Sequence, residues 1–187
     1  MADTPSPERP PLPALKGVFF ITGTDTEVGK TWVSCRLLER AREAGLSCYG
    51  LKPIAAGCEE TADGLRNEDA VNLMASSSLA LPYDVVNPVA LKAAIAPHIA
   101  AAEIGARIDL ETLHDRYQAI KTQSDCMIVE GAGGWRVPLN DFQSMSDLAK
   151  RLELPVILVV GMKLGCLNHA LLTVDAIRAA GLPLAGW

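Results

Sequence analysis

The sequence has no block of Lys and Arg, no paired-cysteine motif and no apolar run of the length that a membrane helix requires. Without a basic block, a net charge of −5 gives no electrostatic reason to expect nucleic acid or an anionic membrane surface as a partner. A membrane-spanning helix needs about 20 consecutive apolar residues, and no stretch approaches that length. These absences favour a soluble protein that acts on a small metabolite.

The number and spacing of the cysteines argue against a secreted, disulfide-bonded protein. Five of them are scattered along the chain, and an odd number without a C-x-x-C pair does not indicate a secreted disulfide framework. The first fifteen residues, MADTPSPERPPLPAL, contain five prolines and lack both the basic and the apolar region of a secretory signal. We therefore predict a disordered Pro-rich tail over residues 1–15, one domain over residues 16–187 and a cytoplasmic location.

Apolar runs of strand length alternate with segments of helical period through the rest of the chain. The predicted strands cover residues 17–22, 47–52, 126–131, 155–161 and 182–187. The predicted helices cover residues 29–44, 69–76, 109–123, 144–153 and 167–180. Residues 77–108 are rich in Ala and Pro and predict a short strand and helical turns. Strands that are apolar on both faces and separated by helices favour an α/β fold, a mostly parallel sheet covered on both sides.

The segment GTDTEVGKT, residues 23–31, follows a predicted strand and precedes a predicted helix. A Gly-rich turn in this place directs backbone N–H groups and a helix N-terminus at phosphate oxygens. Lys30 would supply charge to the terminal phosphates, and Thr31 would offer a hydroxyl to Mg²⁺. The common pattern places its two glycines five positions apart, whereas Gly23 and Gly29 are six apart, so the segment is a near match to a P-loop.

Two carboxylates, Asp25 and Glu27, lie inside this loop. Next to a triphosphate they would repel the ligand, so they require a compensating positive charge from a metal, a lysine or a cationic substrate. An enzyme that handles an amine beside the γ-phosphate could use such residues, whereas a plain nucleotide switch would gain little from them.

Three more polar residues fall at or after predicted strand ends, where ligands bind in sheets of this kind. Lys52 closes the second predicted strand, Asp69 follows it at a helix start, and Glu130 ends the apolar run CMIVE. A carboxylate at the end of a buried strand is costly without a partner, and Mg²⁺ is a suitable one. A purely structural role for each residue stays open. Lys52 would then be a solvated lysine, Asp69 an acid at a helix N-terminus and Glu130 a structural carboxylate.

Five segments in order, GTDTEVGKT, GLKPIAAG, GLRNEDA, VEGAGGW and PVILVVGMKLGCLNHALLT, resemble the dethiobiotin synthetases. The resemblance runs from about residue 17 to residue 187, and the six-residue glycine spacing is the form that this family uses. It implies an ATP- and Mg²⁺-dependent ligase of biotin biosynthesis, which closes 7,8-diaminononanoate with CO₂ to dethiobiotin, ADP and phosphate. The implied route runs through a carbamate and a carbamic-phosphoric anhydride.

The resemblance also implies roles for particular residues. The implied catalytic residues are Lys52, Lys30 and Thr26. The implied metal ligands are Thr31, Asp69 and Glu130. The residues implied to line the nucleotide are Glu27, Val28, Gly29, Lys30, Thr31, Trp32, Asp69, Glu130, Gly131, Ala132 and Gly133. The residues implied to bind the substrate are Lys52, Gly165, Cys166, Leu167 and Asn168, of which the last four would come from the neighbouring subunit of a homodimer.

Two features depart from the family pattern. The family often has a hydroxyl residue after the catalytic lysine, where this sequence has Ala56. Family members also continue beyond the position of Trp187 into a segment that contacts the adenine base. We therefore expect the domain to be incomplete at its C-terminus, with an inactive truncated synthetase as one alternative.

Other members of the fold provide the remaining alternatives. A partitioning-type ATPase carries a second lysine five residues before Lys30, and Asp25 occupies that position. A corrinoid-pathway amidoligase would carry an added glutamine-hydrolysing domain, for which the chain has no room.

Overall fold

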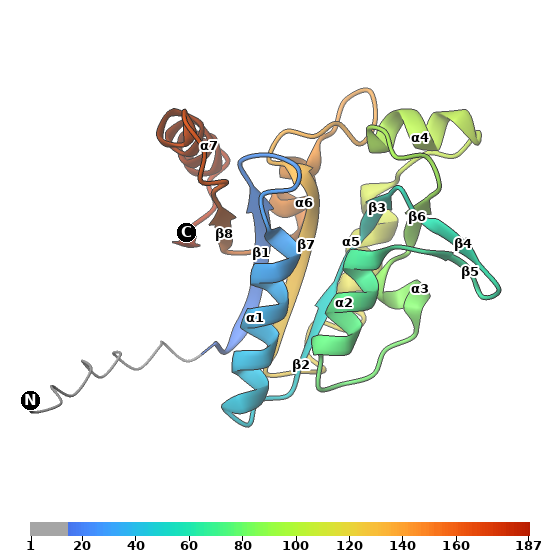
Figure 1. The fold of residues 1–187 in the computed structure, drawn as a ribbon, viewed down its shortest axis with the longest axis horizontal. Coiled ribbons are helices and arrows are strands. Elements are labelled where there is room, and N and C mark those ends of the chain that lie inside the picture. Colours follow the sequence, from blue (N-terminus) through green and yellow to red (C-terminus); the bar gives the residue numbers. More distant parts are fainter. Residues whose placement is uncertain (1–14) are drawn as a thin grey trace, which may run out of the picture.

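The structure is a computed structural model that describes residues 15–187 (Figure 1). Its centre is a sheet of five parallel strands in the order β2-β7-β1-β8-β9. The strands are β1 (Gly17–Gly23), β2 (Cys48–Leu51), β7 (Cys126–Gly134), β8 (Val156–Val159) and β9 (Leu184–Gly186). The long helices are α1 (Lys30–Glu43), α2 (Glu68–Ser76), α5 (Leu110–Gln118), α6 (Met145–Leu152) and α7 (Cys166–Ala179). The predicted α/β fold with a mostly parallel sheet is confirmed.

Apolar side chains cover both faces of the sheet. On one face, Leu38 of α1 and Leu73 of α2 pack in a cluster with Ile128 of β7. On the other face, Leu113 of α5 and Leu148 of α6 belong to a larger cluster. Figure 1 shows α1 and α2 in front of the strands and α5 and α6 behind them. Because the strands are buried on both faces, they read as continuous apolar runs in the sequence.

Helix α1 ends as its sequence predicts. Gly45 follows it with φ +76°, a left-handed conformation that glycine adopts at little cost. The N–H of Gly45 donates to the carbonyl of Arg42, and the N–H of Leu46 donates to the carbonyl of Ala41. These two bonds form a Schellman motif, which satisfies the last carbonyls of the helix.

Residues 77–108 contain the predicted short strand and helical turns: α3 (Tyr83–Val86), β6 (Val89–Leu91) and α4 (Pro97–Glu103). The sequence analysis missed three short strands between Lys52 and Asp69: β3 (Ile54–Ala56), β4 (Glu59–Thr61) and β5 (Gly64–Arg66). Strand β3 pairs with β6, and β4 forms an antiparallel hairpin with β5. The prediction of helix over 109–123 was too long, because α5 ends at Gln118.

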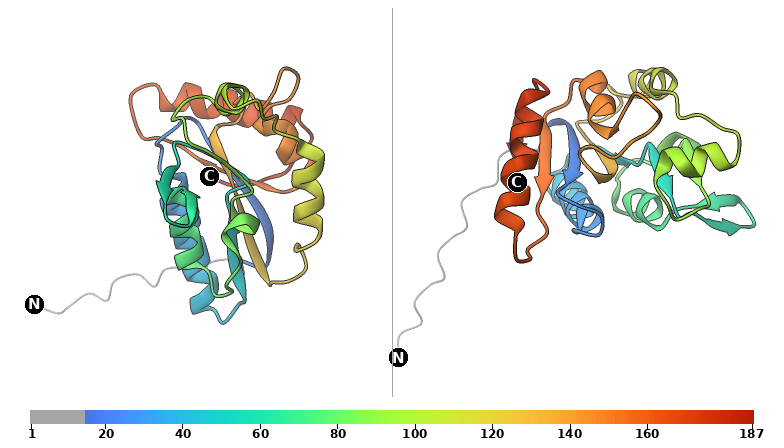
Figure 2. Two further views of the ribbon diagram at one scale, coloured as in Figure 1. Left: turned by 90° about the vertical axis from the view of Figure 1, so that its right-hand side faces the viewer. Right: turned by 90° about the horizontal axis from the view of Figure 1, so that it is seen from above.

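The two ends of the sheet differ in what lies beside them. Helix α7 lies at one side of the molecule, and the β4–β5 hairpin projects from the other side (Figures 1 and 2). The predicted tail over residues 1–15 falls outside the described residues, apart from Leu15, and the domain boundary at residue 16 stays a prediction. Within residues 15–187, no helix combines the length and the apolar composition needed to cross a membrane.

Candidate active site

The phosphate loop connects β1 to α1 through a tightly turned backbone. Glu27 has φ +58° and Gly29, the N-cap of α1, has φ +92°. A Cβ on Gly23 would lie 2.7 Å from Val28 Cγ2 and 2.8 Å from the carbonyl oxygen of Asp25. The loop therefore folds back on its first residue so closely that glycine is required there.

Lys30 lies at the first position of α1 and is buried, with 7% of its surface exposed. Its Nζ donates to the carbonyl oxygen of Asp25 across the loop at 3.1 Å. Burial lowers the pKa of Lys30, and the nearby charge of Lys52 lowers it further. An anionic ligand in the loop would relieve both effects, since it would restore an opposite charge beside the ammonium group.

Glu130 is fully buried in β7 and accepts hydrogen bonds at both carboxylate oxygens. Its Oε1 accepts from Lys52 Nζ at 2.6 Å and from Thr31 Oγ1 at 2.9 Å. Its Oε2 accepts from Ser34 Oγ at 2.7 Å. A buried carboxylate is tolerated only with such partners, so the first two turns of α1 and the end of β2 together hold Glu130 in place.

Lys52 follows the last residue of β2 and is 4% exposed. Its Nζ lies 2.9 Å from Asp69 Oδ2 as well as 2.6 Å from Glu130 Oε1, so one ammonium group bridges two carboxylates. Burial acts to lower the pKa of Lys52, but the two carboxylates have the larger effect, so the pKa is raised overall. Burial likewise acts to raise the pKa of Asp69, but Lys52 and the Thr31 hydroxyl lower it overall.

The three predicted metal ligands, Thr31, Asp69 and Glu130, come together at this point. Thr31 bonds directly to Glu130, and Lys52 joins Glu130 to Asp69. Mg²⁺ prefers oxygen ligands and is usually held by one or two carboxylates together with substrate phosphates. One hydroxyl and two carboxylates beside a phosphate loop fit that donor set in kind and in position. That they bind a metal stays a prediction.

Two adjoining clefts open over these side chains. The smaller, about 280 Å³, lies over the phosphate loop and is lined by Glu27, Gly29, Lys30, Thr31, Trp32, Lys52, Asp69 and Gly133. The larger, about 580 Å³, shares Glu27, Lys52, Asp69 and Gly133 with it and continues past Ala56 to the segment 94–97. Ligand sites of metabolites have volumes of about 300–1,000 Å³, so the two clefts together can hold a nucleotide tail and a small second molecule.

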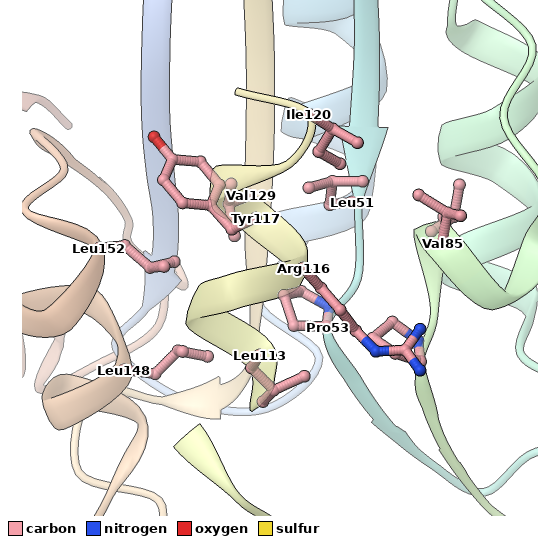
Figure 3. A pocket seen from close by; sticks show the side chains of 12 residues that line it. Leu51, Pro53, Val85, Leu113, Arg116, Tyr117, Ile120, Val129, Leu148 and Leu152 are labelled. Atoms are coloured by element: carbon pink, nitrogen blue, oxygen red, sulfur yellow. The ribbon is translucent and has the colours of Figure 1, made fainter. Parts of the chain in front are cut away.

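A different pocket lies between β2, α3, α5 and α6 (Figure 3). It is lined by apolar side chains, among them Leu51, Leu113 and Leu148, and its volume is about 20 Å³. Such a space accommodates about one water molecule. This pocket is therefore a packing gap of the core and is too small to bind a metabolite.

Asp25, whose role the sequence left open, pairs with a residue that sequence analysis did not single out. Its Oδ2 lies 3.2 Å from Lys163 Nζ, and its Oδ1 accepts from the N–H of Thr26 at 2.9 Å. The hydrogen bond from Thr26 and the charge of Lys163 lower the pKa of Asp25. The positive charge that the loop acids require is thus supplied in part by the segment between β8 and α7.

The remaining predicted residues divide into two groups. The larger cleft is lined by Thr26, Ala132 and Gly133. Trp32 lines the smaller cleft, with 67% of its surface exposed. Gly131 is buried, and its carbonyl oxygen lies 3.4 Å from Lys52 Nζ. Val28 packs against the apolar cluster that includes Leu38 and Leu73, and it lines neither cleft. The four residues predicted to bind the substrate from a neighbouring subunit also lie outside both clefts of their own chain: Gly165, Cys166, Leu167 and Asn168. A role for these four requires a second copy of the chain, and it stays a prediction.

Sequence analysis missed Ser34, Asn87 and Lys163. A signal was available for Ser34, because it lies one helical turn after Lys30 and shares its face of the helix. Asn87 is 2% exposed, and its amide donates to the carbonyl oxygen of Lys52 at 2.6 Å. It lies in the Ala- and Pro-rich segment, where no periodicity indicates which residues face the site.

Solved structures support the fold. The kinase domain of the Escherichia coli tyrosine kinase ETK matches 94% of this chain and 67% of its own length, with a TM-score of 0.53 and 14% identity. The chimerical protein CapA2B2 matches with a TM-score of 0.52, also at 14% identity, over 90% of this chain and 73% of its own. At this level of identity the likeness concerns the fold alone.

Sequence relatives are much closer. The family model described as an AAA domain matches residues 17–187. The ATP-dependent dethiobiotin synthetase BioD of Cellvibrio japonicus is 58% identical over 92% of this chain and 75% of its own length. The protein of the same name from Pseudomonas aeruginosa PAO1 is 56% identical over 90% of this chain and 75% of its own, and that of Marinobacter nauticus is 51% identical over 92% and 74%. The chain therefore spans about three quarters of the length of these relatives and belongs to the family of ATP-dependent dethiobiotin synthetases, which are ligases.

Proposed function

We propose that this protein forms dethiobiotin from 7,8-diaminononanoate, CO₂ and ATP, releasing ADP and phosphate. The observation that carries the proposal is the meeting of two buried lysines, Lys30 and Lys52, with two carboxylates, Asp69 and Glu130, over one phosphate loop. Membership of the synthetase family supports the overall reaction. The charged side chains around the phosphate loop support the individual steps.

The phosphate loop would bind the ATP tail. The backbone around Gly29 and the N-terminus of α1 direct N–H groups at phosphate oxygens, and Lys30 lies beside them in the smaller cleft. Glu27, Trp32 and Gly133 would border the nucleotide. Lys30 is buried without a carboxylate within ion-pair distance in the part of the chain that the structure describes, so a γ-phosphate would be its natural partner.

Thr31, Asp69 and Glu130 would hold Mg²⁺ between the nucleotide and the rest of the site. When bound, the ion would neutralise charge on the phosphates as the terminal one is transferred. Ser34 would contribute indirectly, because its hydroxyl fixes the oxygen of Glu130 that Thr31 and Lys52 leave free.

In the first step, one amine nitrogen of the substrate attacks CO₂ and loses a proton, which gives a carbamate. A carbamate oxygen then attacks the γ-phosphorus, the bond to ADP breaks, and a carbamic-phosphoric anhydride forms. In the last step the second amine attacks the carbamoyl carbon and loses a proton while phosphate leaves, which closes the cyclic urea.

Lys52 and Lys30 would stabilise the negative charge that these steps place on the carbamate and phosphoryl oxygens. Thr26 lines the larger cleft and would contact the reacting groups. The acids Glu27 and Asp69 line the same cleft and favour a cationic diamine there. Ala56 offers no hydroxyl, so the substrate would lack a side-chain hydrogen bond at that position.

The substrate carboxylate would bind to Gly165–Asn168 of a second copy in a homodimer. This segment is the N-terminal end of α7, where the positive end of the helix dipole favours an anion. The adjoining apolar side chains Leu164, Leu167 and Leu171 are exposed, which fits a surface covered by a partner chain. A cytoplasmic location is part of the proposal, since all three substrates are metabolites of the cell interior.

Phosphate release by the purified protein tests the proposal. With diaminononanoate, bicarbonate, Mg²⁺ and ATP, we expect release that depends on the diamine and on the metal. Release independent of the diamine would instead identify a nucleotide switch of the partitioning type, and no release would contradict the proposed activity of this chain.

A further inference from the structure

A chain of hydrogen bonds leads from helix α2, at a partly buried end, to the buried backbone of Lys52. The Asn67 N–H donates to Tyr83 Oη at 2.7 Å, and Tyr83 Oη donates to Asn87 Oδ1 at 3.0 Å. Asn87 Nδ2 then donates to the carbonyl oxygen of Lys52 at 2.6 Å. We refer to these three residues as the Asn67–Tyr83–Asn87 chain.

Both ends of this chain reach the candidate active site. At one end, Asn67 is the N-cap of α2 and accepts from the N–H of Ala70 at 3.3 Å, so it fixes the first turn in which Asp69 lies. At the other end is Lys52, whose ammonium group is 2.9 Å from Asp69. The hydrogen bonds and the ion pair therefore form a closed circuit, in which the spacing of Lys52 and Asp69 depends on Tyr83 and Asn87.

Further contacts hold the members of the circuit in place. Asn87 also donates to the carbonyl of Val89 at 3.3 Å, and the Lys52 N–H donates to the carbonyl of Val86 at 2.8 Å. The guanidinium of Arg66 lies 4.1 Å from the centre of the Tyr83 ring, a cation–π contact that holds the ring. Burial raises the pKa of Tyr83, so its hydroxyl remains a donor to Asn87.

We propose that Tyr83 and Asn87 are positioning residues of the reaction, which fix the backbone of Lys52 relative to α2 so that its ammonium group meets Asp69 and Glu130. The inference rests on the proposed function. Neither Tyr83 nor Asn87 lines the two clefts, so both act through Lys52. A lysine side chain has four rotatable bonds and holds a catalytic position only if its backbone is fixed, and a displacement of about 1 Å can cost about 10²-fold in rate.

Tyr83→Phe tests the inference, with Tyr49→Phe as a control. Tyr83→Phe removes two partly buried hydrogen bonds, one from the Asn67 N–H and one to Asn87. Tyr49→Phe removes one, because Tyr49 Oη donates to the carbonyl of Ile120 at 2.5 Å. Tyr49 lies on β2 itself but has no bond to Lys52 or its partners. We expect Tyr83→Phe to lower kcat about tenfold with little change in the KM for ATP, and Tyr49→Phe to leave kcat near the wild-type value. Equal losses in the two variants would overturn the inference.

A double-mutant cycle separates positioning from general destabilisation. If Tyr83 acts through Lys52, then Tyr83→Phe should change the residual turnover of Lys52→Met by less than about twofold, because the interacting partner is gone. A full additive loss would show that Tyr83 acts independently of Lys52 and would contradict the inference.

A measurement that needs no turnover distinguishes failure of this inference from failure of the proposed function. In ¹⁵N-lysine-labelled protein, two carboxylates should protect the ammonium protons of Lys52 from exchange with water, so that this group gives an NMR signal. The Lys52 ammonium signal should be absent in Lys52→Met. We expect the signal to weaken in Tyr83→Phe and to persist in Tyr49→Phe. An unchanged signal in Tyr83→Phe overturns the inference, whereas a wild-type protein with the signal but without diamine-dependent phosphate release contradicts only the proposed function.

Discussion

Lys52 Nζ lies 2.6 Å from Glu130 Oε1, although the two residues are 78 positions apart in the sequence. They meet because β2 and β7 are adjacent parallel strands with Leu51 in register with Val129, so Lys52, the next residue, lies beside Glu130. The contact is buried, so each charged group needs the other to compensate for its removal from water.

Replacing Lys52 should damage both turnover and stability. In Lys52→Met, we expect kcat to fall by about 10²-fold, the scale of removing one preorganised charge-stabilising donor. Loss of one partner of a buried ion pair costs about 3 kcal/mol, so the free energy of unfolding should fall by that order. Steady-state kinetics and urea unfolding measure the two effects, and near-normal turnover in a folded variant would refute the catalytic role of Lys52.

Ser34→Ala removes the donor to Glu130 Oε2 and leaves that oxygen buried without a hydrogen bond. We expect the free energy of unfolding to fall by about 1–3 kcal/mol, the cost of an unsatisfied buried polar group. Glu130 would also be less well oriented, so the apparent affinity for Mg²⁺ in the phosphate-release assay should fall. Ser34→Thr retains the hydroxyl and serves as the control; an identical loss in both variants would point to packing instead.

Asp69 links stability to pH. Its pKa in the folded protein is below the ordinary value of 3.8 because of Lys52, so its contribution to stability is present above pH 3.8 and is lost as the pH falls through the folded pKa. Wild type and Asp69→Asn should therefore differ in unfolding free energy near neutral pH and converge in acid below the ordinary value. A constant difference across that range would show that Asp69 is not paired in this way.

The ion pair between Asp25 and Lys163 should matter more for nucleotide binding than for stability. Both side chains are well exposed, and exposed pairs contribute about 0–1 kcal/mol. In Lys163→Met, the charge of Asp25 is no longer compensated, so the KM for ATP should rise severalfold and the rise should shrink at high salt. The double variant Asp25→Asn, Lys163→Met should recover affinity; if it binds ATP no better than Lys163→Met, then Lys163 acts without Asp25.

Gly23→Ala tests the geometry of the phosphate loop. The added methyl group would lie 2.8 Å from the carbonyl oxygen of Asp25 and 2.7 Å from Val28, so the loop must shift. We expect ATP binding to be lost in calorimetry while the sheet stays folded by circular dichroism. Gly186→Ala, at a position where no atom lies within 4 Å of the added group, is the control.

The sequence predicts the sheet well because its strands are buried on both faces and its helices carry ordinary start and stop signals. The same reasoning predicts that Lys52, Asp69 and Glu130 lie together, since all three fall at strand ends or just after them. It misses the β4–β5 hairpin, whose strands have three residues each and no apolar face, although Asp63-Gly64 is a turn signal.

Other parts of the site depend on tertiary contacts that no local pattern encodes. The pairing of Asp25 with Lys163 spans 138 positions and joins two loops. Tyr83 and Asn87 reach Lys52 only because α3 packs beside β2. Local propensity and periodicity predict elements, whereas these contacts follow from how the elements pack.

Labelled CO₂ shows whether ring closure accompanies ATP hydrolysis. With ¹³C-bicarbonate, diaminononanoate, Mg²⁺ and ATP, we expect a cyclic urea that carries one ¹³C for each phosphate released, detected by mass spectrometry and ¹³C NMR. We also expect Lys52→Met to lose both products in parallel. Phosphate release without ¹³C in the product, or label incorporated without ATP, would contradict the account.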